Sequence, residues 1–544
     1  MPSTILDSAV FRDIFTTEAM RNVFSDENRV QKYLDFEAAL ARAQAGLGLI
    51  PKEAATEIVR HCSAEKIDMA KLKEATERIG YPVLPVVQQL VKLCKDGLGE
   101  WSHWGATTQD ITDTATIMQI REALALVEKD IDGICDGLAN LAKKYRDTPM
   151  AGRSNLQQAV PITFGYKMAT MLAAFERHKQ RLKELKPRVL VGEFGGAAGT
   201  LSSLGKDGLK VQDELMKELK LGQPEISWHT VRDRIAEVGC FLGLVTGSCG
   251  KIAFDVKLLM QTEVEEVYEP FHAGRGSSST MPQKRNPISS VYITAQTAMV
   301  RQLVAALLDA QVEDHERSTG PWEIEWIALP EIFMLSAGAL SQTRFLVEGL
   351  QVNEKKMREN LDITKGLIMS EAVMMGLGAE LGRNKAHDLV YDICRDVVKT
   401  GRPLIDLLAL MEQTGIAVDI DHLQALEAEF AGGVKLAAEA AYSAIGKEIN
   451  LGSPKQLQGV LFDELGMPKT KKTKTGYTTD AEALQQLYDK TEHPFLQHLL
   501  DHRDVTRLKQ TVEGLRKSIS DDGRIHTTYA QTIAATGRLS SNDP

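Results

Sequence analysis

The stretch that most constrains the fold is the run 231–269, which contains no proline before Pro270. Its apolar residues, such as Leu242 and Ile252, fall on more than one side of a helix drawn through it. A helix that is apolar all round is buried in a bundle or between subunits. Residues 301–314 continue the pattern, so the sequence predicts a mainly α protein built around a bundle of long helices.

Helical patterning also divides the rest of the chain. The 544 residues are enough for two to four domains. We expect a small helical domain over residues 1–110 and the long-helix bundle over 111–350. A truncated helical domain follows over 351–405, and a segment of different character, predicted to be helical with a few strands, occupies 406–544.

Composition narrows the class of protein. The net charge of −10 argues against nucleic acid as the partner of the whole chain. The six cysteines form no CxxC pair, which predicts thiols in a reducing compartment. The N-terminus lacks a basic region followed by an apolar core, and no uninterrupted apolar run reaches membrane-spanning length. We therefore expect a cytoplasmic protein without membrane contact.

A second informative feature is the loop 274–287, which reads Gly-Arg-Gly-Ser-Ser-Ser-Thr-Met-Pro-Gln-Lys-Arg-Asn-Pro. Its glycines permit positive φ angles, and its serines offer short hydroxyls and backbone N–H donors. Such a loop can close over an anion and place a hydroxyl beside it. A flexible Gly/Ser linker is the alternative, but a linker gains nothing from the basic, polar residues that follow.

A polar turn precedes the first long helix. Thr107 and Thr108 follow Gly105 just before a helix that we expect to start near Asp113. Hydroxyls and N–H groups at a helix N-terminus suit a carboxylate. Simple capping by Thr108 and Asp110 is the alternative.

The serine loop resembles the signature of the fumarase/aspartase superfamily, G-S-S-x-M-P-x-K-x-N-P. The motif is long and specific, although Ser277 stands where glycine is usual. The segment from His103 to Thr108 resembles the superfamily's His-x-Gly-x-Thr-Ser block. The positions of the loop that match the signature are Ser278, Ser279, Met281, Pro282, Lys284, Asn286 and Pro287.

Two departures from the superfamily bear on the reaction. The block 152–159 resembles one in which fumarases and adenylosuccinate lyases carry Gly-Arg-Thr-His, but Asn155 stands at the histidine position. By spacing from Asn286, Val291 stands where the glutamate partner of that histidine usually lies. Adding water or expelling an amine needs a second acid or base opposite the serine.

A carboxylate, with a pKa of about 4, leaves or attacks without protonation at neutral pH. The two losses therefore favour the cycloisomerase branch of the superfamily, which lactonises 3-carboxy-cis,cis-muconate and also lacks this pair. A C–N lyase similar to adenylosuccinate lyase is the alternative.

The resemblance covers residues from about 5 to about 405 and implies roles for individual residues. Ser278 would be the base in elimination and the proton donor in lactonisation, while Lys284 and Asn286 stabilise the developing aci-carboxylate. No metal or organic cofactor is implied. The expected partners are a small polycarboxylate and three further copies in a homotetramer with shared active sites. The residues implied to bind substrate are His103, Thr107, Thr108, Arg153, Gln157, Ser279, Met281, Arg232, Arg317 and Ser318.

Arginine is suited to this role because its guanidinium binds carboxylates bidentately. Salt bridges within a helical bundle would use the same side chains, and for Arg232 and Arg317 both readings stay open.

Past about residue 405 the sequence resembles a different family. The blocks 411–419, 449–457, 472–479, 493–496, 525–529 and 535–544 are similar to the thumb and early palm of bacterial family A DNA polymerases, with a seam near 403–412. The blocks that carry the two metal-binding aspartates do not follow, so we expect no polymerase activity. Weak, salt-sensitive DNA contact through Lys472, Lys474, Arg507 and Arg538 is the most that the tail predicts. A solvated charge run is the alternative, and an inactive chimera is an alternative for the whole chain.

Overall fold

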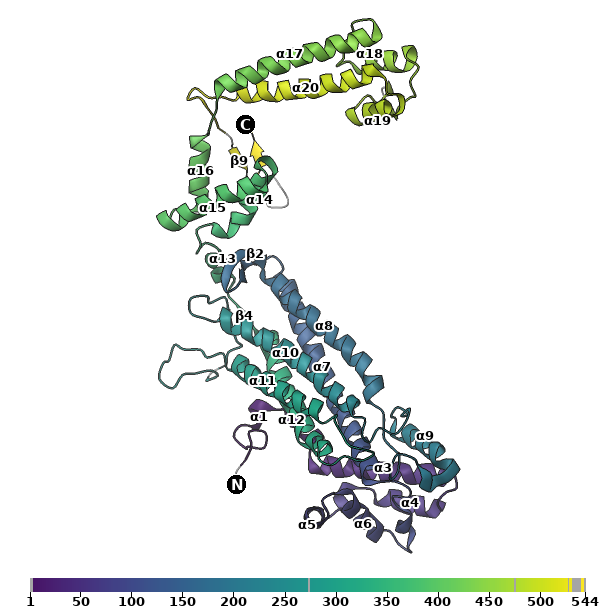
Figure 1. The fold of residues 1–544 in the computed structure, drawn as a ribbon. Helices are drawn as coiled ribbons and strands as arrows, with labels where there is room; N and C mark the ends of the chain where they lie inside the picture. Colours follow the sequence, from purple (N-terminus) through teal and green to yellow (C-terminus); the bar gives the residue numbers. More distant parts are fainter. Residues whose placement is uncertain (1–2, 273, 474–475, 527, 531–539, 543–544) are drawn as a thin grey trace. The chain divides into compact units, whose positions relative to one another are not determined.

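The computed structural model describes residues 3–272, 274–473, 476–526, 528–530 and 540–542. Most of them are helical, and the described strands form only two-stranded antiparallel pairs, which confirms the expected mainly α fold (Figure 1). The chain folds as two units, Met1–Leu361 and Asp362–Pro544.

The N-terminal part of the first unit is a layer of helices around α3 (Asp26–Gly46). This helix begins where it does because the Ser25 hydroxyl accepts a hydrogen bond from the Asn28 N–H group at 3.2 Å. Its apolar residues pack with those of its neighbours in a separate core cluster. The neighbouring helices are α4 (Lys52–His61), α5 (Met69–Ile79), α6 (Val83–Leu93) and α9 (Gly208–Leu219). The short helices α1 (Arg12–Phe15) and α2 (Glu18–Val23) precede α3 and pack mainly on the long helices described next.

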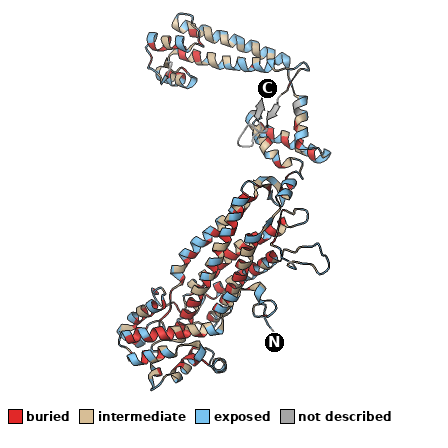
Figure 2. Ribbon diagram, turned by 180° about the vertical axis from the view of Figure 1, so that it is seen from behind, coloured by how far each residue is buried: buried red, intermediate tan, exposed pale blue. Residues whose placement is uncertain are grey.

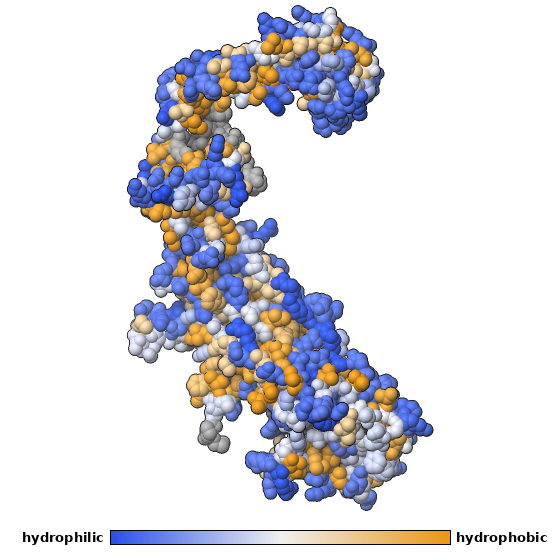
Figure 3. Space-filling view, in the orientation of Figure 1, coloured by the Kyte–Doolittle hydropathy of each residue, from blue (hydrophilic) through white to orange (hydrophobic). Residues whose placement is uncertain are grey.

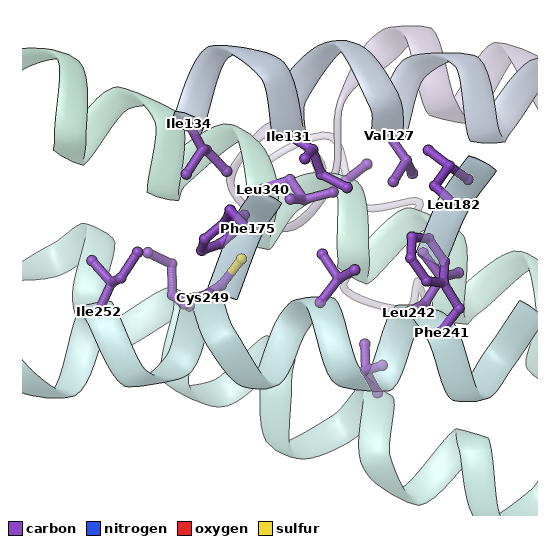
Figure 4. Packing of buried hydrophobic residues seen from close by; sticks show 14 of the residues in the cluster. Val127, Ile131, Ile134, Phe175, Leu182, Phe241, Leu242, Cys249, Ile252 and Leu340 are labelled. Atoms are coloured by element: carbon purple, nitrogen blue, oxygen red, sulfur yellow. The ribbon is translucent and has the colours of Figure 1, made fainter. Parts of the chain in front are cut away.

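The predicted bundle of long helices is present in the first unit. Side chains of four of its helices point toward one another in a continuous apolar core, among them Ile131, Phe175, Leu242 and Leu340 (Figure 4). Buried residues run along the middle of these helices, and exposed ones follow their outer sides (Figure 2). The bundle consists of α7 (Thr108–Lys144), α8 (Phe164–Val189), α10 (Asp233–Leu259), α11 (Ile288–Asp309) and α12 (Pro321–Gly349).

Helix α7 sets the distance between the two ends of the bundle. It has 37 residues, so at 1.5 Å per residue it is about 55 Å long. A capping box between Thr107 and Asp110 opens it, some residues earlier than the start near Asp113 that the sequence suggested. The α3 layer lies at its first turns, and a β-hairpin follows its last turn.

That hairpin pairs β1 (Pro149–Ser154) with β2 (Gln157–Thr163). Its two-residue turn places Asn155 at φ 50° and Leu156 at φ 65°. Positive φ at both central residues is the type I′ geometry that hairpins prefer, and asparagine tolerates it well. The residue in the histidine position is thus one that suits the turn. At the same end, β3 (Val267–Tyr268) pairs with β4 (Gln351–Val352), followed by α13 (Glu354–Leu361).

Three helices of the described chain, α10, α11 and α12, are long and apolar enough to cross a membrane by length and composition. This corrects the expectation that no stretch of the chain reaches that length. In this fold the three helices pack against one another and bury polar groups such as Thr246 and Gln296. Helix α11 is the least covered, because only 28% of its apolar window is buried.

The second unit has a helical base and a long arm. The base joins α14 (Ser370–Leu381), α15 (Arg383–Thr400) and α16 (Leu404–Thr414) around a small core. In the arm, α17 (Ile420–Ile445) packs along α20 (Pro494–Lys517). The core at its tip includes α18 (Pro454–Gln458) and α19 (Ala481–Thr491). The strand pairs are β5 (Ile416–Ala417) with β8 (Arg524–Ile525), β6 (Lys472–Thr473) with β7 (Gly476–Tyr477), and β9 (Thr528–Ala530) with β10 (Ser540–Asn542).

Candidate functional site

The serine loop is closed at its base by backbone contacts. Ser277 and Arg285 form an isolated β-bridge, and the Asn286 amide groups of backbone and side chain both donate to the Gly276 carbonyl at 3.0 Å. Gly276 has a φ of 71°, and a Cβ atom there would lie 2.7 Å from the Asn286 carbonyl oxygen. Glycine at 276 is therefore a requirement of this closure.

Within the loop, the Ser278 hydroxyl oxygen accepts hydrogen bonds from two backbone N–H groups. The donors are Thr280 at 3.3 Å and Met281 at 3.1 Å. Donors aimed at a hydroxyl oxygen stabilise its alkoxide form, which is the kind of activation that a serine acid–base needs. Ser279, Met281 and Lys284 are exposed beside it.

Two arginines fix the loop to the bundle. The Arg285 guanidinium lies 4.7 Å from the ring centroids of both Tyr268 and Phe271, and it donates to the Glu269 carbonyl at 3.2 Å. The Arg275 guanidinium lies 4.4 Å from the Phe345 ring centroid. Stacking on aromatic faces holds these cations at the foot of the loop, while Lys284 extends from its exposed part.

The helix after the loop starts at a buried carboxylate. Glu269 accepts hydrogen bonds from the N–H groups of Ser289 and Ser290, at 3.0 and 2.8 Å, in the first turn of α11. The Glu269 carboxylate thereby satisfies backbone N–H groups that have no partner within the helix at its first turn. Val291, in the position of the superfamily's glutamate, follows directly and is 49% exposed.

Arg153 and Gln157 lie at the same end of the bundle as the serine loop. The Arg153 guanidinium pairs bidentately with the buried Glu266, at 2.8 and 2.9 Å, and Asn360 donates to the same carboxylate at 2.8 Å. Arg153 therefore already has a carboxylate partner within its own chain. Gln157 is exposed at the hairpin turn.

The other end of the bundle brings together Thr107, Thr108, Gln109 and Arg317, which we call the α7 corner. The Arg317 guanidinium donates to the Gln109 side-chain oxygen at 2.6 Å and to the carbonyls of Gly196 and Ala197 at 2.8 and 3.0 Å. All these acceptors are neutral, and among the residues that the structure describes Arg317 forms no ion pair beside the N-terminus of α7. A positive charge at a helix N-terminus suits a bound carboxylate.

His103 and Ser318 flank this corner. His103 adopts a left-handed backbone with φ 61°, and its ring Nδ1 lies 2.8 Å from the buried Glu37 carboxylate. Burial lowers the pKa of His103, but the neighbouring Glu37 outweighs it, so the pKa is raised overall. The Ser318 hydroxyl accepts from the Trp322 N–H at 3.1 Å and so satisfies one N–H group in the first turn of α12.

The prediction that Arg232 binds substrate is wrong for this chain. Its side chain is 1% exposed and forms hydrogen bonds with two buried carboxylates, Asp113 at 2.7 Å and Glu325 at 2.9 Å. The buried Arg232 guanidinium therefore links the start of α10 to Asp113 on α7 and to Glu325 on α12. The competing interpretation, a salt bridge within the bundle, holds for this residue.

A buried cluster that sequence reasoning missed supports the α7 corner. Asp110, Glu193 and His229 lie close enough to share a metal ion. The Asp110 oxygens, however, already accept from the N–H groups of Thr107, Gly195 and Gly196 and from His229. Because these hydrogen bonds already use both Asp110 oxygens, the three side chains fit a hydrogen-bonded cluster. Glu193 carries no local signal in the sequence, because its partners lie 35 and more residues away.

The residues implied to bind one substrate thus form two groups in one chain. Ser278, Lys284, Asn286, Arg153 and Gln157 lie at the hairpin end of the bundle, and the α7 corner lies at the start of α7. Thr107 is separated from the hairpin by the full length of α7, about 55 Å. No small molecule spans that distance.

In the second unit, Lys472 lies on β6 and Arg507 on α20, and both are exposed. Lys474 and Arg538 fall outside the described residues. DNA contact through these side chains stays a prediction.

The long helices, the serine loop and the α7 corner define a lyase of the fumarase/aspartase type. The lyase family profile matches residues 13–301, the adenylosuccinate lyase C-terminus profile matches 366–429, and the DNA polymerase family A profile matches 420–544. The chain therefore belongs to the fumarase/aspartase lyase superfamily and continues into a segment of family A DNA polymerase, as the sequence predicted. The last two matches overlap over 420–429, beyond the seam expected near 403–412.

Individual relatives are similar over most of their length. Trans-aconitate decarboxylase 1 of Mycosarcoma maydis is 58% identical over 424 residues, which cover 78% of this chain and 86% of the relative. The 3-carboxy-cis,cis-muconate cycloisomerase of Pseudomonas aeruginosa is 46% identical over 427 residues, 78% of this chain and 93% of the relative. The crystal structure of the corresponding cycloisomerase from Acinetobacter calcoaceticus sp. ADP1 matches with a TM-score of 0.70 at 40% identity, covering 74% of this chain and 92% of that one.

Proposed function

We propose that the lyase part is an enzyme that transfers a proton at a carbon next to a carboxylate in a small unsaturated tricarboxylate. The observation that carries the proposal is the Ser278 hydroxyl, which accepts from two N–H groups in a loop that also carries the exposed Lys284. A proton donor and a cation in one loop suit a substrate whose carbanion is spread over a carboxylate.

Two reactions share this step. In lactonisation of 3-carboxy-cis,cis-muconate, a substrate carboxylate attacks the double bond and Ser278 protonates the neighbouring carbon. In decarboxylation of trans-aconitate, a C–C bond breaks, carbon dioxide leaves, and the same hydroxyl protonates the carbanion that remains. Both start from a tricarboxylate, and neither needs the His–Glu pair whose positions hold Asn155 and Val291.

Sequence identity to the relatives favours one of these two reactions, and the absence of the His–Glu pair favours the other. Loss of the His–Glu pair favours the cycloisomerase, whereas the 58% identity to a trans-aconitate decarboxylase exceeds the 46% identity to the cycloisomerase. We therefore take trans-aconitate as the first candidate substrate and 3-carboxy-cis,cis-muconate as the second.

The proposed site is completed by further copies of the chain. The serine loop and the α7 corner lie at opposite ends of the bundle, so one substrate reaches both only where different copies meet. Exposed apolar side chains on the bundle, including Phe254, Met299 and Leu308, offer a surface for that contact. Apolar surface is visible over α11 and α12 in Figure 3. We propose the homotetramer that the superfamily resemblance implies.

The test offers both acids to purified full-length protein. Turnover is followed by the ultraviolet absorbance of the muconate and by carbon dioxide release from trans-aconitate. We expect one of the two to be consumed, and we expect Ser278→Ala to reduce kcat at least about a hundredfold, since it removes the proton donor. Ser277→Ala is the matched control within the loop, because Ser277 is exposed and its bridge to Arg285 uses the backbone. Turnover of adenylosuccinate alone would show that the C–N lyase alternative is right.

A further inference from the structure

We propose that His229 and Glu193 are positioning residues, which hold the α7 corner in its binding geometry through the buried carboxylate of Asp110. This inference rests on the proposed function, because it assigns the corner to a substrate carboxylate. His229 and Glu193 are 3% and 0% exposed, so neither touches the substrate itself.

Asp110 is the centre of the arrangement. One carboxylate oxygen accepts from the Gly195 N–H at 2.8 Å and from the His229 ring Nε2 at 2.7 Å. The other accepts from the N–H groups of Thr107 and Gly196, at 2.9 and 3.0 Å. One buried side chain therefore fixes the first turn of α7 against the 195–196 backbone, and the imidazole sets the rotation of that carboxylate.

His229 also holds the next residue of the corner. Its backbone carbonyl accepts from the Gln109 side-chain amide at 2.6 Å, and the oxygen of that amide accepts from Arg317. The ring and the backbone of one histidine thus contact Asp110 and Gln109, two adjacent residues of α7. Displacement of His229 would move the helix start and the Arg317 guanidinium together.

Glu193 fixes the turn that carries His229. One of its carboxylate oxygens accepts from the Trp228 N–H at 2.5 Å. The other, 3.7 Å from His229 Nε2, has no hydrogen-bond partner among the residues that the structure describes. The backbone N–H and carbonyl of Glu193 both bond the Thr114 hydroxyl at 2.8 Å, which ties this segment to α7.

The experiment compares His229→Leu with His229→Gln in the full-length protein. Leucine removes the donor to Asp110, while the glutamine amide can still donate. For whichever of the two acids is turned over, we expect His229→Leu to raise KM by about tenfold to a hundredfold with a smaller change in kcat, because the corner is displaced rather than lost. We expect His229→Gln to recover much of the change.

The matched control is His178→Leu. His178 is 4% exposed in α8 and bonds Ser248 at 2.8 Å, so it is an equally buried histidine outside both site groups. Its substitution is expected to leave KM unchanged. An increase in KM for His178→Leu equal to that for His229→Leu would overturn the assignment.

A second readout does not depend on turnover. Hydrogen exchange by mass spectrometry is measured on peptides that contain the N–H groups of Thr107, Gly195 and Gly196, with a peptide from the serine loop as reference. We expect exchange of the first set to increase in His229→Leu and in Glu193→Gln, and the reference to stay unchanged. If the wild type consumes neither acid, the proposed function fails while this result still decides the positioning role. Unchanged exchange, or faster exchange with unchanged KM, would refute it.

Discussion

The buried Glu313 carboxylate lies near two other buried carboxylates around Arg232. Asp113 and Glu325 bond the Arg232 guanidinium directly, whereas the nearest Glu313 oxygen is 3.8 Å away. Neither Glu313 oxygen has a hydrogen-bond partner among the described residues. Burial, opposed by Arg232 and reinforced by the neighbouring acids, raises the pKa of Glu313 to about 8.

This pKa predicts a pH dependence of stability. An acid whose folded pKa lies above its ordinary value of 4.5 keeps a proton that the unfolded chain releases. Stability should therefore fall as the pH rises from about 4.5 to about 8, by at most about 1.4 kcal/mol per pH unit. Glu313→Gln removes that loss, so the Tm of the variant relative to wild type is expected to increase steadily between pH 5 and pH 8.

Thermal unfolding in a series of buffers measures this difference. Glu316→Gln, an exposed change in the same loop, is the control and should show no such trend. A Tm difference for Glu313→Gln that is independent of pH would contradict the assigned titration.

At the level of single residues, sequence patterns located side chains better than they assigned roles. The loop signature identified Ser278, and the structure then shows the two N–H donors on its oxygen. For Arg232 the sequence left substrate binding and a salt bridge both open, because no local pattern reveals carboxylates 119 and 93 residues away in the chain. Burial against those two distant carboxylates makes Arg232 part of a salt bridge within the bundle.

At the level of elements, glycine geometry separates two positions of the serine loop. Gly274 and Gly276 both have positive φ angles, 86° and 71°. A Cβ atom at 274 meets nothing within 4 Å, whereas one at 276 lies 2.7 Å from the Asn286 carbonyl oxygen. Both substitutions carry the same kind of backbone strain, and only the second forces the loop open.

We therefore expect Gly276→Ala to lower kcat by about tenfold to a hundredfold, because Ser278 is displaced from its position relative to the substrate. Gly274→Ala is expected to have a much smaller effect. Steady-state kinetics on the accepted acid measures both, and Tm measurements check that the bundle is unaffected. Equal losses for the two variants would mean that strain alone, rather than closure of the loop, sets activity.

Helices could be predicted from the sequence where the apolar pattern extends over many residues. The run 231–269 contains α10, and the polar turn before residue 113 contains the capping box of α7. The two-residue turn at Asn155 and Leu156 was not predicted, because positive φ angles are imposed by strand pairing rather than by composition.

At the level of the whole molecule, the proposed sharing of the site between copies makes association a condition of activity. Met299 on α11 is 52% exposed in the single chain, on the least covered of the three apolar helices α10, α11 and α12. A charge there would have to be buried in any contact that covers α11, at a cost that an apolar residue avoids. We expect Met299→Glu to shift the molar mass toward the monomer and to abolish turnover.

Light scattering coupled to size exclusion measures the mass, and an activity assay on the same fractions measures turnover. Leu209→Glu, an exposed leucine on α9, is the matched control because it is 72% exposed in the same unit. A monomeric Met299→Glu variant with full activity would show that one chain suffices, contrary to the proposed assembly.

The pairing of Ile416 with Ile525 brings the two ends of the polymerase-like arm together. An extension that leaves and rejoins its base at one strand pair can change length without moving the residues below it. Matching turns of α17 and α20 can therefore be lost together while the base and this strand pair keep their structure.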